Sequence, residues 1–341
     1  MDLDCFFAAV EELDHPQWKG KPLAVARKSK RSIITTCNYE ARKYGLYSSM
    51  PLFMAIKRCP KLHILPPRFP LYKKKSQEVF EILSSYTRKL EQTSIDEGYL
   101  DVTNRPEDAL ALAYLIQEEI QEKTGLSASL GVSFNKFLAK LASDWNKPHG
   151  IFQILPEDLP ELLFPLSLSK IYGLGEVSTK KLQQFGLETI EDVYHLQKNQ
   201  LIQLFGKQGS AIYNAIRGID PREVTTNSKR KSLGIERTFQ EDLSRKEDLK
   251  NLLESFAKQL EKDLQNKNLS CRTIQIKLKT YDFQSLTRSR SFDQPTNKAA
   301  DLTYIGKSLL DEIVELGPFR LIGLSCFNLQ SNHYQQLSLL D

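Results

Sequence analysis

Apolar residues recur with a helical period in two segments of the first half of the chain. Residues 76–92 and 108–123 each place their apolar side chains on one face of a predicted helix. These faces consist of Val79, Phe80, Leu83, Tyr86 and Leu90 in the first segment, and of Leu112, Leu115, Ile116 and Ile120 in the second. Residues 94–103 and 128–134 are strand candidates. Helices that cover one face of a mainly antiparallel sheet give an α+β domain.

Alternation of apolar and polar residues returns in the last third of the chain. In residues 270–283, Ile274, Ile276 and Leu278 face one way, whereas the other face is polar. That polar face carries Thr273, Gln275, Lys277 and Lys279. Residues 287–292 and 321–329 are further strand candidates, and the first of them places Arg288 and Arg290 on a single face. Helical patterns at 247–265 and 298–315 separate the strands, which predicts a four-stranded sheet backed by two helices.

The middle of the chain has short helical segments joined by glycine turns. Residues 170–187 have the form of a helix–Gly-x-Gly–helix hairpin, in which Gly173 and Gly175 let backbone N–H groups approach a phosphate. A turn with a purely structural role is the alternative. Residues 220–232 are polar and indicate a linker. Residues 11–66, basic and interrupted by prolines, indicate a small α/β insertion.

Composition is that of an ordinary globular protein. The 341 residues are 40% hydrophobic and 26% charged, and this length suggests two to four domains. The net charge of +5 permits nucleic-acid binding, and Lys and Arg outnumber Asp and Glu between residues 229 and 320. No apolar run approaches the roughly 18 residues of a membrane span. The five scattered cysteines indicate reduced thiols of a cytoplasmic protein.

Two acidic clusters lie inside apolar, β-prone stretches. Asp2 and Asp4 belong to residues 1–11, and Asp96 and Glu97 to residues 94–103. A buried carboxylate needs a cation, and neither cluster contains a basic residue. Oxygen ligands suit Mg²⁺ or Mn²⁺, and such a set could hold two metals about 4 Å apart for nucleotidyl transfer. The alternative is a pair of strands whose acids face solvent.

Four motifs, in this order, resemble the Y family of DNA polymerases, in its bacterial polymerase IV branch. They are MDLDCFFAAVE (1–11), CNYEARKYGLYSSMP (37–51), SIDEGYLDVT (94–103) and GVSFNKFLAKLASDWNKPHG (131–150). The resemblance covers essentially the whole chain. It implies an α+β multidomain, right-hand polymerase fold. Its expected parts are a palm (1–10 and 67–155), fingers (11–66), a helix-hairpin-helix thumb (156–220), a linker (221–231), a four-stranded little finger (232–330) and a flexible tail (331–341).

The resemblance also implies the reaction and its residues. The expected activity is template-directed, low-fidelity translesion DNA synthesis without proofreading, by a monomer in the bacterial cytoplasm, associated with the nucleoid. Asp2, Asp96 and Glu97 would hold two Mg²⁺, with Mn²⁺ as a substitute, and the Leu3 carbonyl would complete one metal shell. Asp4 would have a supporting role. Phe7 would be the steric gate against ribonucleotides. The expected dNTP contacts are Thr36, Tyr39, Arg42 and Lys147.

Further residues are expected to bind macromolecules. Primer–template DNA would be held through phosphate contacts by Gly173, Gly175, Lys277, Lys279, Arg288 and Arg290. The tail resembles the short peptide by which bacterial polymerases bind the sliding clamp, with Gln336, Leu337, Leu339 and Leu340 as contacts. Leu340 stands where that peptide pattern prefers Phe. No membrane partner is expected.

The amino terminus raises an alternative. Family members have several residues before the first catalytic Asp, whereas only Met1 precedes Asp2 here. With an incomplete first strand, the chain would be a catalytically impaired accessory protein that binds DNA and the clamp. A nucleotidyl cyclase is a third hypothesis, because it shares paired metal-binding acids. It would not need the hairpin motif or the basic C-terminal sheet.

Overall fold

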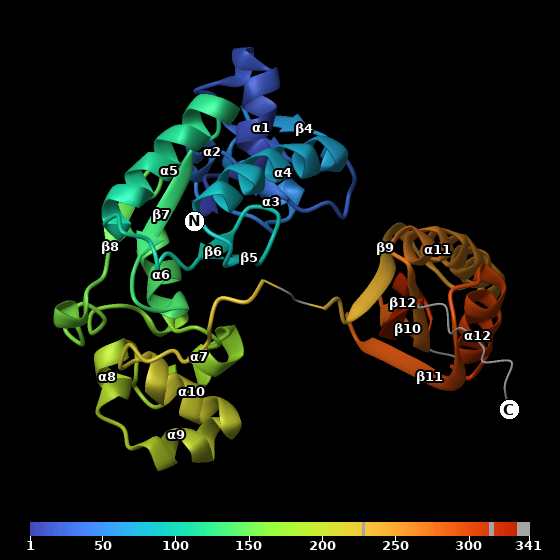
Figure 1. Cartoon of the computed structure of the whole chain (residues 1–341). Helices are drawn as coiled ribbons and strands as arrows, with labels where there is room; N and C mark the ends of the chain where they lie inside the picture. Colours follow the sequence, from blue (N-terminus) through green and yellow to red (C-terminus); the bar gives the residue numbers. More distant parts are fainter. Residues whose placement is uncertain (227–228, 314–316, 333–341) are drawn as a thin grey trace, which may run out of the picture. The chain divides into compact units, whose positions relative to one another are not determined.

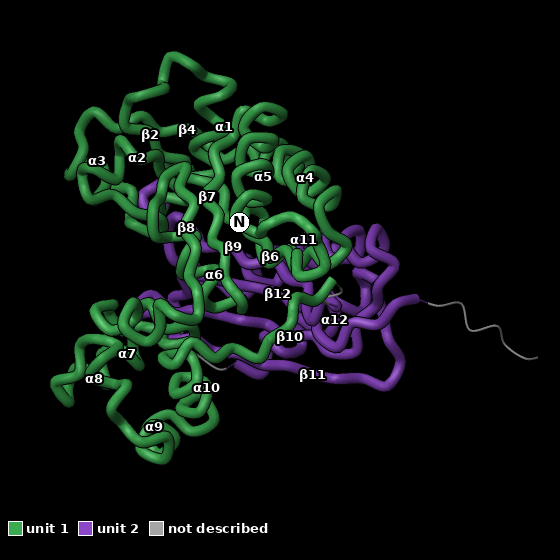
Figure 2. The backbone as a smooth tube through the Cα atoms, turned by 60° about the vertical axis from the view of Figure 1, so that its left-hand side comes forward, with its two compact units in different colours: residues 1–28, 33–227 green, residues 29–32, 228–341 purple. Residues whose placement is uncertain are grey.

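Residues 1–226, 229–313 and 317–332 are described by the computed structural model, and their contacts divide the chain into two units. Unit 1 comprises residues 1–28 and 33–227, and unit 2 comprises residues 29–32 and 228–341 (Figure 2). Over the described residues, no helix has both the length and the apolar character needed to cross a membrane.

The centre of unit 1 is a three-stranded sheet beside a two-stranded hairpin. In the sheet, β1 is antiparallel to β7, and β7 is parallel to β8. These strands are β1 (Asp2–Leu3), β7 (Ala128–Val132), β8 (Ile151–Gln153), and the hairpin strands β5 (Leu90–Gln92) and β6 (Gly98–Leu100). Helices α1 (Phe6–Asp14), α4 (Phe69–Tyr86) and α5 (Ala109–Thr124) pack on them and share one hydrophobic core (Figure 1). The mainly antiparallel α+β arrangement is confirmed.

Two details of the helical prediction are wrong. Helix α4 ends at Tyr86, because Thr87 is already extended, and Leu90 lies in β5 opposite Leu100. The periodicity that included Leu90 was therefore a coincidence of spacing. In α5, Leu115 is 52% exposed, and Ala113 takes the place on the buried face beside Leu112 and Ile116.

The segment predicted as a small α/β insertion has its own sheet and core. Its strand order is β3–β2–β4, with β2 antiparallel to β3 and parallel to β4. Its elements are η1 (Pro16–Trp18), β2 (Leu23–Val25), β3 (Thr36–Cys37), α2 (Tyr39–Arg42), α3 (Leu52–Arg58) and β4 (His63–Leu65). The boundary predicted at residue 10 falls inside α1, so this fingers segment begins along a helix that also serves the central core.

Short helices follow the central sheet, around a separate hydrophobic cluster. They are α6 (Lys136–Ser143), η2 (Pro156–Asp158), η3 (Leu168–Lys170), α7 (Glu176–Gln183), α8 (Ile190–Tyr194), α9 (Lys198–Phe205) and α10 (Lys207–Ala215). The hairpin motif differs from the prediction in one respect, since only the single 3₁₀ turn η3 precedes Gly173. Gly173 has a φ of 82°, which favours glycine, whereas Gly175 has an ordinary backbone as the N-cap of α7.

The first part of the predicted linker is bound to unit 1. Lys136, which is 8% exposed, donates from Nζ to Glu91 Oε2 (2.6 Å) and to the carbonyl of Glu223 (3.2 Å). The same Glu91 oxygen accepts from the backbone N–H of Thr225 (2.8 Å), and Asp220 Oδ2 accepts from the N–H of Phe137 (3.0 Å). The segment from Asp220 to Thr225 is therefore fixed by hydrogen bonds.

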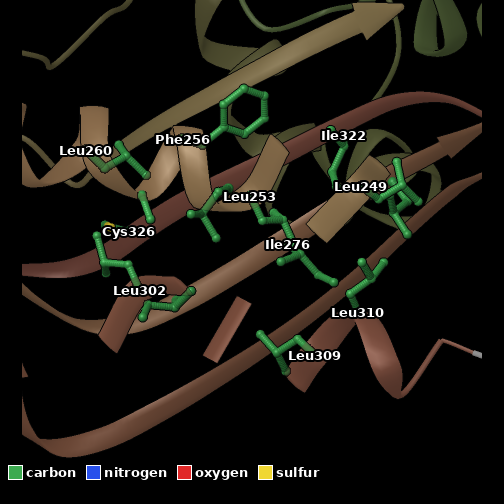
Figure 3. Close-up of a cluster of buried hydrophobic side chains, with 14 of the residues drawn as sticks. Leu249, Leu253, Phe256, Leu260, Ile276, Leu302, Leu309, Leu310, Ile322 and Cys326 are labelled. Carbon is green, nitrogen blue, oxygen red and sulfur yellow. The ribbon is translucent and has the colours of Figure 1, made fainter. Parts of the chain in front are cut away.

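Unit 2 contains the predicted four-stranded sheet and its two helices. The strand order is β11–β10–β12–β9, and every neighbouring pair is antiparallel. The elements are β9 (Ser232–Leu243), α11 (Lys246–Asn266), β10 (Leu269–Thr280), β11 (Ser285–Thr296), α12 (Ala299–Asp311) and β12 (Phe319–Ser331). Figure 3 shows Leu253 and Phe256 of α11 and Leu302 of α12 beside Ile276 and Cys326 of the sheet. The alternating pattern of β10 is confirmed, because its apolar face is fully buried.

One buried carboxylate joins α1 to α4 in unit 1. Glu11 is 1% exposed and accepts hydrogen bonds from Arg68 Nε (3.0 Å), Arg68 Nη2 (2.6 Å) and the hydroxyl of Tyr72 (2.5 Å). Tyr72 is itself fully buried and stacks on Phe7. Because an unpaired buried charge is costly, these donors are needed to keep Glu11 in the core.

We expect Arg68→Ala to lower the free energy of unfolding of unit 1 by about 2 kcal/mol, since Arg68 is partly exposed and water replaces some of the lost interaction. Tyr72→Phe removes one hydrogen bond and should cost about 1 kcal/mol. Both tryptophans, Trp18 and Trp145, lie in unit 1, so their fluorescence in urea reports this unit. Lys75→Ala, which removes a surface pair with Glu78, is the control. If Arg68→Ala and Lys75→Ala lowered the free energy of unfolding equally, Glu11 would not be the carboxylate that stabilises the contact between α1 and α4.

Candidate active site

A cavity of about 170 Å³ in unit 1 is lined by most of the residues predicted to bind the metal ions and the nucleotide. Its walls come from β1, α1, β3, α2 and the segments around residues 96 and 147. The lining residues that the sequence singled out are Asp2, Leu3, Phe7, Thr36, Tyr39, Arg42, Asp96 and Lys147. Segments more than a hundred residues apart in sequence therefore meet at one polar hollow.

Strand β1 positions the first carboxylate because it is held from both sides. Asp2 pairs with Ser129 of β7, and on the other side Asp2 forms a bridge with Glu97. The N–H of Leu3 donates to the carbonyl of Asp96 (2.9 Å). Asp2 is thus fixed in the sheet, next to the second acidic cluster.

Two lysines form ion pairs with the carboxylate of Asp2, a residue that is 7% exposed. Lys140 Nζ lies 2.6 Å from Asp2 Oδ2 and 2.8 Å from Glu97 Oε1, so it bridges the two acids. Lys147 Nζ lies 2.6 Å from Asp2 Oδ1. Across the described residues, no three His, Cys, Asp or Glu side chains are arranged as a metal cluster. The oxygen donors nevertheless suit a hard cation, because this buried site already attracts positive charge from two side chains.

The electrostatics of the cluster follow from these contacts. Burial alone would raise the pKa of Asp2, but a hydrogen bond shared with Glu97 and the charges of Lys140 and Lys147 outweigh it and lower the pKa to about 2. Burial and the neighbouring Asp2 raise the pKa of Glu97. Burial opposes the charge on Lys140, but Asp2 and Glu97 raise its pKa overall. Asp2 and Lys140 are therefore both charged at neutral pH.

Asp4 has a different environment. It is 3% exposed and accepts hydrogen bonds from the hydroxyls of Ser127 (2.7 Å), Ser129 (2.9 Å) and Tyr39 (3.3 Å), and from the N–H of His149 (2.8 Å). All four donors are neutral. Such a carboxylate fixes the elements around it, which accords with the supporting role expected for it.

The short helix α2 presents two predicted dNTP contacts. Its N-cap, Asn38, is 1% exposed and accepts from the N–H groups of Ala41 and Leu23 (both 3.0 Å), which locks the start of the helix. The guanidinium of Arg42 lies over the ring of Tyr39, 4.8 Å from its centroid. Burial and the nearby Asp4 raise the pKa of Tyr39, so its hydroxyl remains a donor at neutral pH.

Phe6 and Phe7 both line the cavity, but Phe6 is 2% exposed whereas Phe7 is only partly buried. The Phe7 ring stacks on Tyr72, with centroids 4.3 Å apart and 13° between the planes, and meets Phe69 edge-on. Phe7 is only partly buried, so its ring both packs against the core and faces the cavity.

Family models match almost the whole chain. Residues 1–144 match the impB/mucB/samB family, and residues 230–339 match the C-terminal domain of the same family. Residues 169–220 match the thumb domain of DNA polymerase-iota.

Proteins named DNA polymerase IV are similar over the full length. The one from Staphylococcus saprophyticus is 39% identical, and those from Staphylococcus epidermidis and Staphylococcus aureus are 38% identical. Each alignment covers 100% of this chain and 97% of the relative. A solved Y-family DNA polymerase chimera is 30% identical, with a TM-score of 0.89 over 97% of this chain and 98% of the chimera.

The chain belongs to the Y family of DNA polymerases. It is therefore a DNA-directed DNA polymerase of the translesion type, and DNA and dNTPs are its substrates. Y-family polymerases generally use divalent metal ions. The match to a thumb domain and the similarity to the chimera confirm the expected right-hand fold.

The predicted DNA contacts of this Y-family polymerase lie on different surfaces. Lys277 and Lys279 lie on the face of β10 opposite to the buried Ile276, and Lys277 Nζ pairs with both oxygens of Glu236 (3.0 Å each). Arg288 is paired with Ile276 across the β10–β11 ladder. Directly paired residues share a face, so Arg288 lies on the helix side of the sheet.

Arg290 follows the same rule, because it is the cross-strand partner of the buried Ile274. Its guanidinium donates to Ser308 Oγ (3.1 Å) and pairs with Glu312, both at the end of α12. The expectation that Arg288 and Arg290 share a face is correct. They do not, however, lie on the same face of the sheet as Lys277 and Lys279 of β10. In this register, the even-numbered residues of the edge strand β11 face the helices.

The thumb glycines occupy the turn expected of a Y-family helix-hairpin-helix. The amide of Gln208 donates to the carbonyl of Gly173, and a Cβ on Gly175 would meet no neighbouring atom. The predicted clamp peptide, Gln336, Leu337, Leu339 and Leu340, lies outside the described residues.

Sequence reasoning missed two residues of the polymerase site, Lys140 and Asp144. Both belong to the region of α6, which packs closely on β7 because Gly131 has no side chain; a Cβ there would lie 2.0 Å from the carbonyl oxygen of Ala139. Lys140 and Asp144 are four residues apart at the end of α6, and Lys147 follows three residues later, just beyond the helix, where it pairs with Asp144. That spacing was the available signal.

Proposed function

We propose that the polymerase joins dNTPs to a primer 3′-OH at the cavity beside β1, with Asp2, Asp96 and Glu97 holding two Mg²⁺ and the Leu3 carbonyl as a further ligand. The observation that carries this proposal is the convergence of both acidic clusters with Tyr39, Arg42 and Lys147 at one hollow. When bound, the metal ions lower the pKa of the primer hydroxyl and neutralise the triphosphate.

The remaining cavity residues position the nucleotide. Arg42 and Lys147 both line the cavity and supply positive charge for phosphate oxygens, and the Thr36 and Tyr39 hydroxyls supply donors. Phe7 excludes a 2′-hydroxyl, since its ring is held rigidly by Tyr72 and Phe69. The Asp4–Tyr39 hydrogen bond ties this nucleotide side of the cavity to the palm.

DNA is held by phosphate contacts that do not read sequence. The support for this proposal is the N-terminus of the eight-residue helix α7 at Gly173 and Gly175, and the cationic face of β10 with Lys277 and Lys279. Arg288 is the weaker candidate because of the face on which it lies, and Lys277 and Arg290 would each have to leave an acidic partner, Glu236 and Glu312.

Replacing Asp96 or Glu97 by Ala tests the metal assignment. Extension in a single turnover should fall about 1000-fold, since a lost metal ligand removes several kcal/mol of transition-state stabilisation. The affinity for primer–template DNA, measured by fluorescence anisotropy, should stay within about twofold. Asp101→Asn, which changes an acid of the same motif that pairs with Lys89 at the surface, is the control. A variant that extends primers at the wild-type rate would show that its carboxylate is not a ligand.

Replacing Phe7 by Ala tests the sugar gate. The ratio of kcat/KM for a ribonucleotide to that for the matching deoxyribonucleotide should rise about 100-fold, because space opens beside C2′. Tyr72→Phe keeps the stacked ring and should leave this ratio unchanged. The ratio is informative even if overall activity falls. An unchanged ratio in Phe7→Ala would assign the ring to packing alone.

We also propose that the polymerase acts as a monomer that binds the sliding clamp through Gln336, Leu337, Leu339 and Leu340; the support is the sequence of the tail. Clamp binding raises the effective concentration of the enzyme at the primer end. Deleting residues 336–341 should leave extension by the free enzyme unchanged and remove its stimulation by a loaded clamp. Leu340→Phe should increase that stimulation. Equal stimulation with and without the tail would refute the proposal.

A further inference from the structure

Two ammonium groups hold the carboxylates where a divalent cation is proposed to bind. Lys140 bridges Asp2 and Glu97, and Lys147 covers the other oxygen of Asp2. Cations at such short separations repel one another strongly in a site with little water. Lys140 must therefore leave the two acids before a metal ion can be held between them.

Asp144 is placed to receive Lys140. Its Oδ1 lies 3.5 Å from Lys140 Nζ and 2.7 Å from Lys147 Nζ. In the described part of the chain, the ion pairs of these two lysines involve Asp2, Glu97 and Asp144 alone. Lys140 therefore has a further acceptor only 3.5 Å from the present position of its ammonium group.

The position of Asp144 is unfavourable for the helix itself. It is the C-cap of α6, where the partial negative charge of the helix end disfavours an acidic side chain. An acidic residue at the C-terminal end of a helix needs a compensating contact, and Lys140 and Lys147 provide it. Asp144 is about one-third exposed, so it can accept a second ammonium group without a large desolvation cost.

We propose that Asp144 is a positioning residue that takes the ammonium group of Lys140 from Asp2 and Glu97 on binding of a divalent cation. Asp144 thereby sets the metal affinity of the polymerase without contacting the metal. The inference rests on the proposed function, in which Asp2 and Glu97 hold the cation. The exchange moves one ammonium group between carboxylates and breaks no covalent bond.

The test measures Mn²⁺ binding to the full chain without DNA or nucleotide, from the electron paramagnetic resonance signal of free Mn²⁺. Lys140→Met should strengthen Mn²⁺ binding roughly tenfold, because a competing cation is removed. Asp144→Asn should weaken it roughly threefold, since Lys140 then stays on Asp2. Asp144→Glu retains the acceptor and should restore most of the affinity. Asp101→Asn is the control for the loss of a distant charge.

The double variant Lys140→Met/Asp144→Asn decides between mechanisms. Without Lys140, Asp144→Asn should reduce the Mn²⁺ affinity less than it does in the wild-type background, because no ammonium group then has to move from Asp2 to Asp144. An equal loss of Mn²⁺ affinity in both backgrounds would show that Asp144 acts by its charge, as a ligand or through Lys147, and would overturn the inference. Asp2→Asn separates this failure from that of the proposed function: unchanged Mn²⁺ binding in that variant would mean that the metal site itself is wrongly assigned.

Discussion

Unit 1 depends on the burial of one carboxylate in a strand of two residues. Asp2 is held between β7 and residues 96–98 by backbone pairing, and this pairing brings the two acidic clusters together. A buried carboxylate is costly unless cations compensate it, so basic side chains must come close. They come from the α6 region, which can approach because Gly131 offers no side chain to obstruct it. The sheet pairing buries the carboxylate, and the glycine and the lysines together meet the electrostatic requirement that this burial creates.

Helix α1 connects the buried strand β1 to the core around α4. Cys5 has a left-handed backbone with a φ of 39°, which turns the chain sharply from β1 into α1. Phe7 then points to the cavity, and one turn later Glu11 points to Arg68 and Tyr72 of the α4 region. Because Tyr72 stacks on Phe7 and donates to the buried Glu11, this carboxylate limits the freedom of a ring at the cavity. The packing of unit 1 and the shape of this cavity are therefore coupled through the stacking of Phe7 on Tyr72.

The sequence predicted what local periodicity and motif order determine. The alternation of β10, the helices α5 and α11 and the membership of the family needed no long-range information. Features that depend on contacts distant in sequence were missed. The side of the sheet on which Arg288 lies follows from its pairing with Ile276. Periodicity predicted that the first helix includes Leu90, whereas Leu90 pairs with Leu100 in a strand. The acidic clusters contain no basic residue, yet Lys140 reaches Asp2 across 138 positions.

Asp2 and Asp4 show why a motif cannot by itself separate a ligand from a support. They are two positions apart, similarly buried and flanked by similar residues. Asp4 is surrounded by hydroxyls and a backbone N–H, which are fixed and neutral and leave it little capacity for another partner. Asp2 is paired with flexible ammonium groups, which an ion of higher charge can displace. The partners of Asp4 are fixed, whereas those of Asp2 can leave, and this is the property that the proposed metal ligand requires.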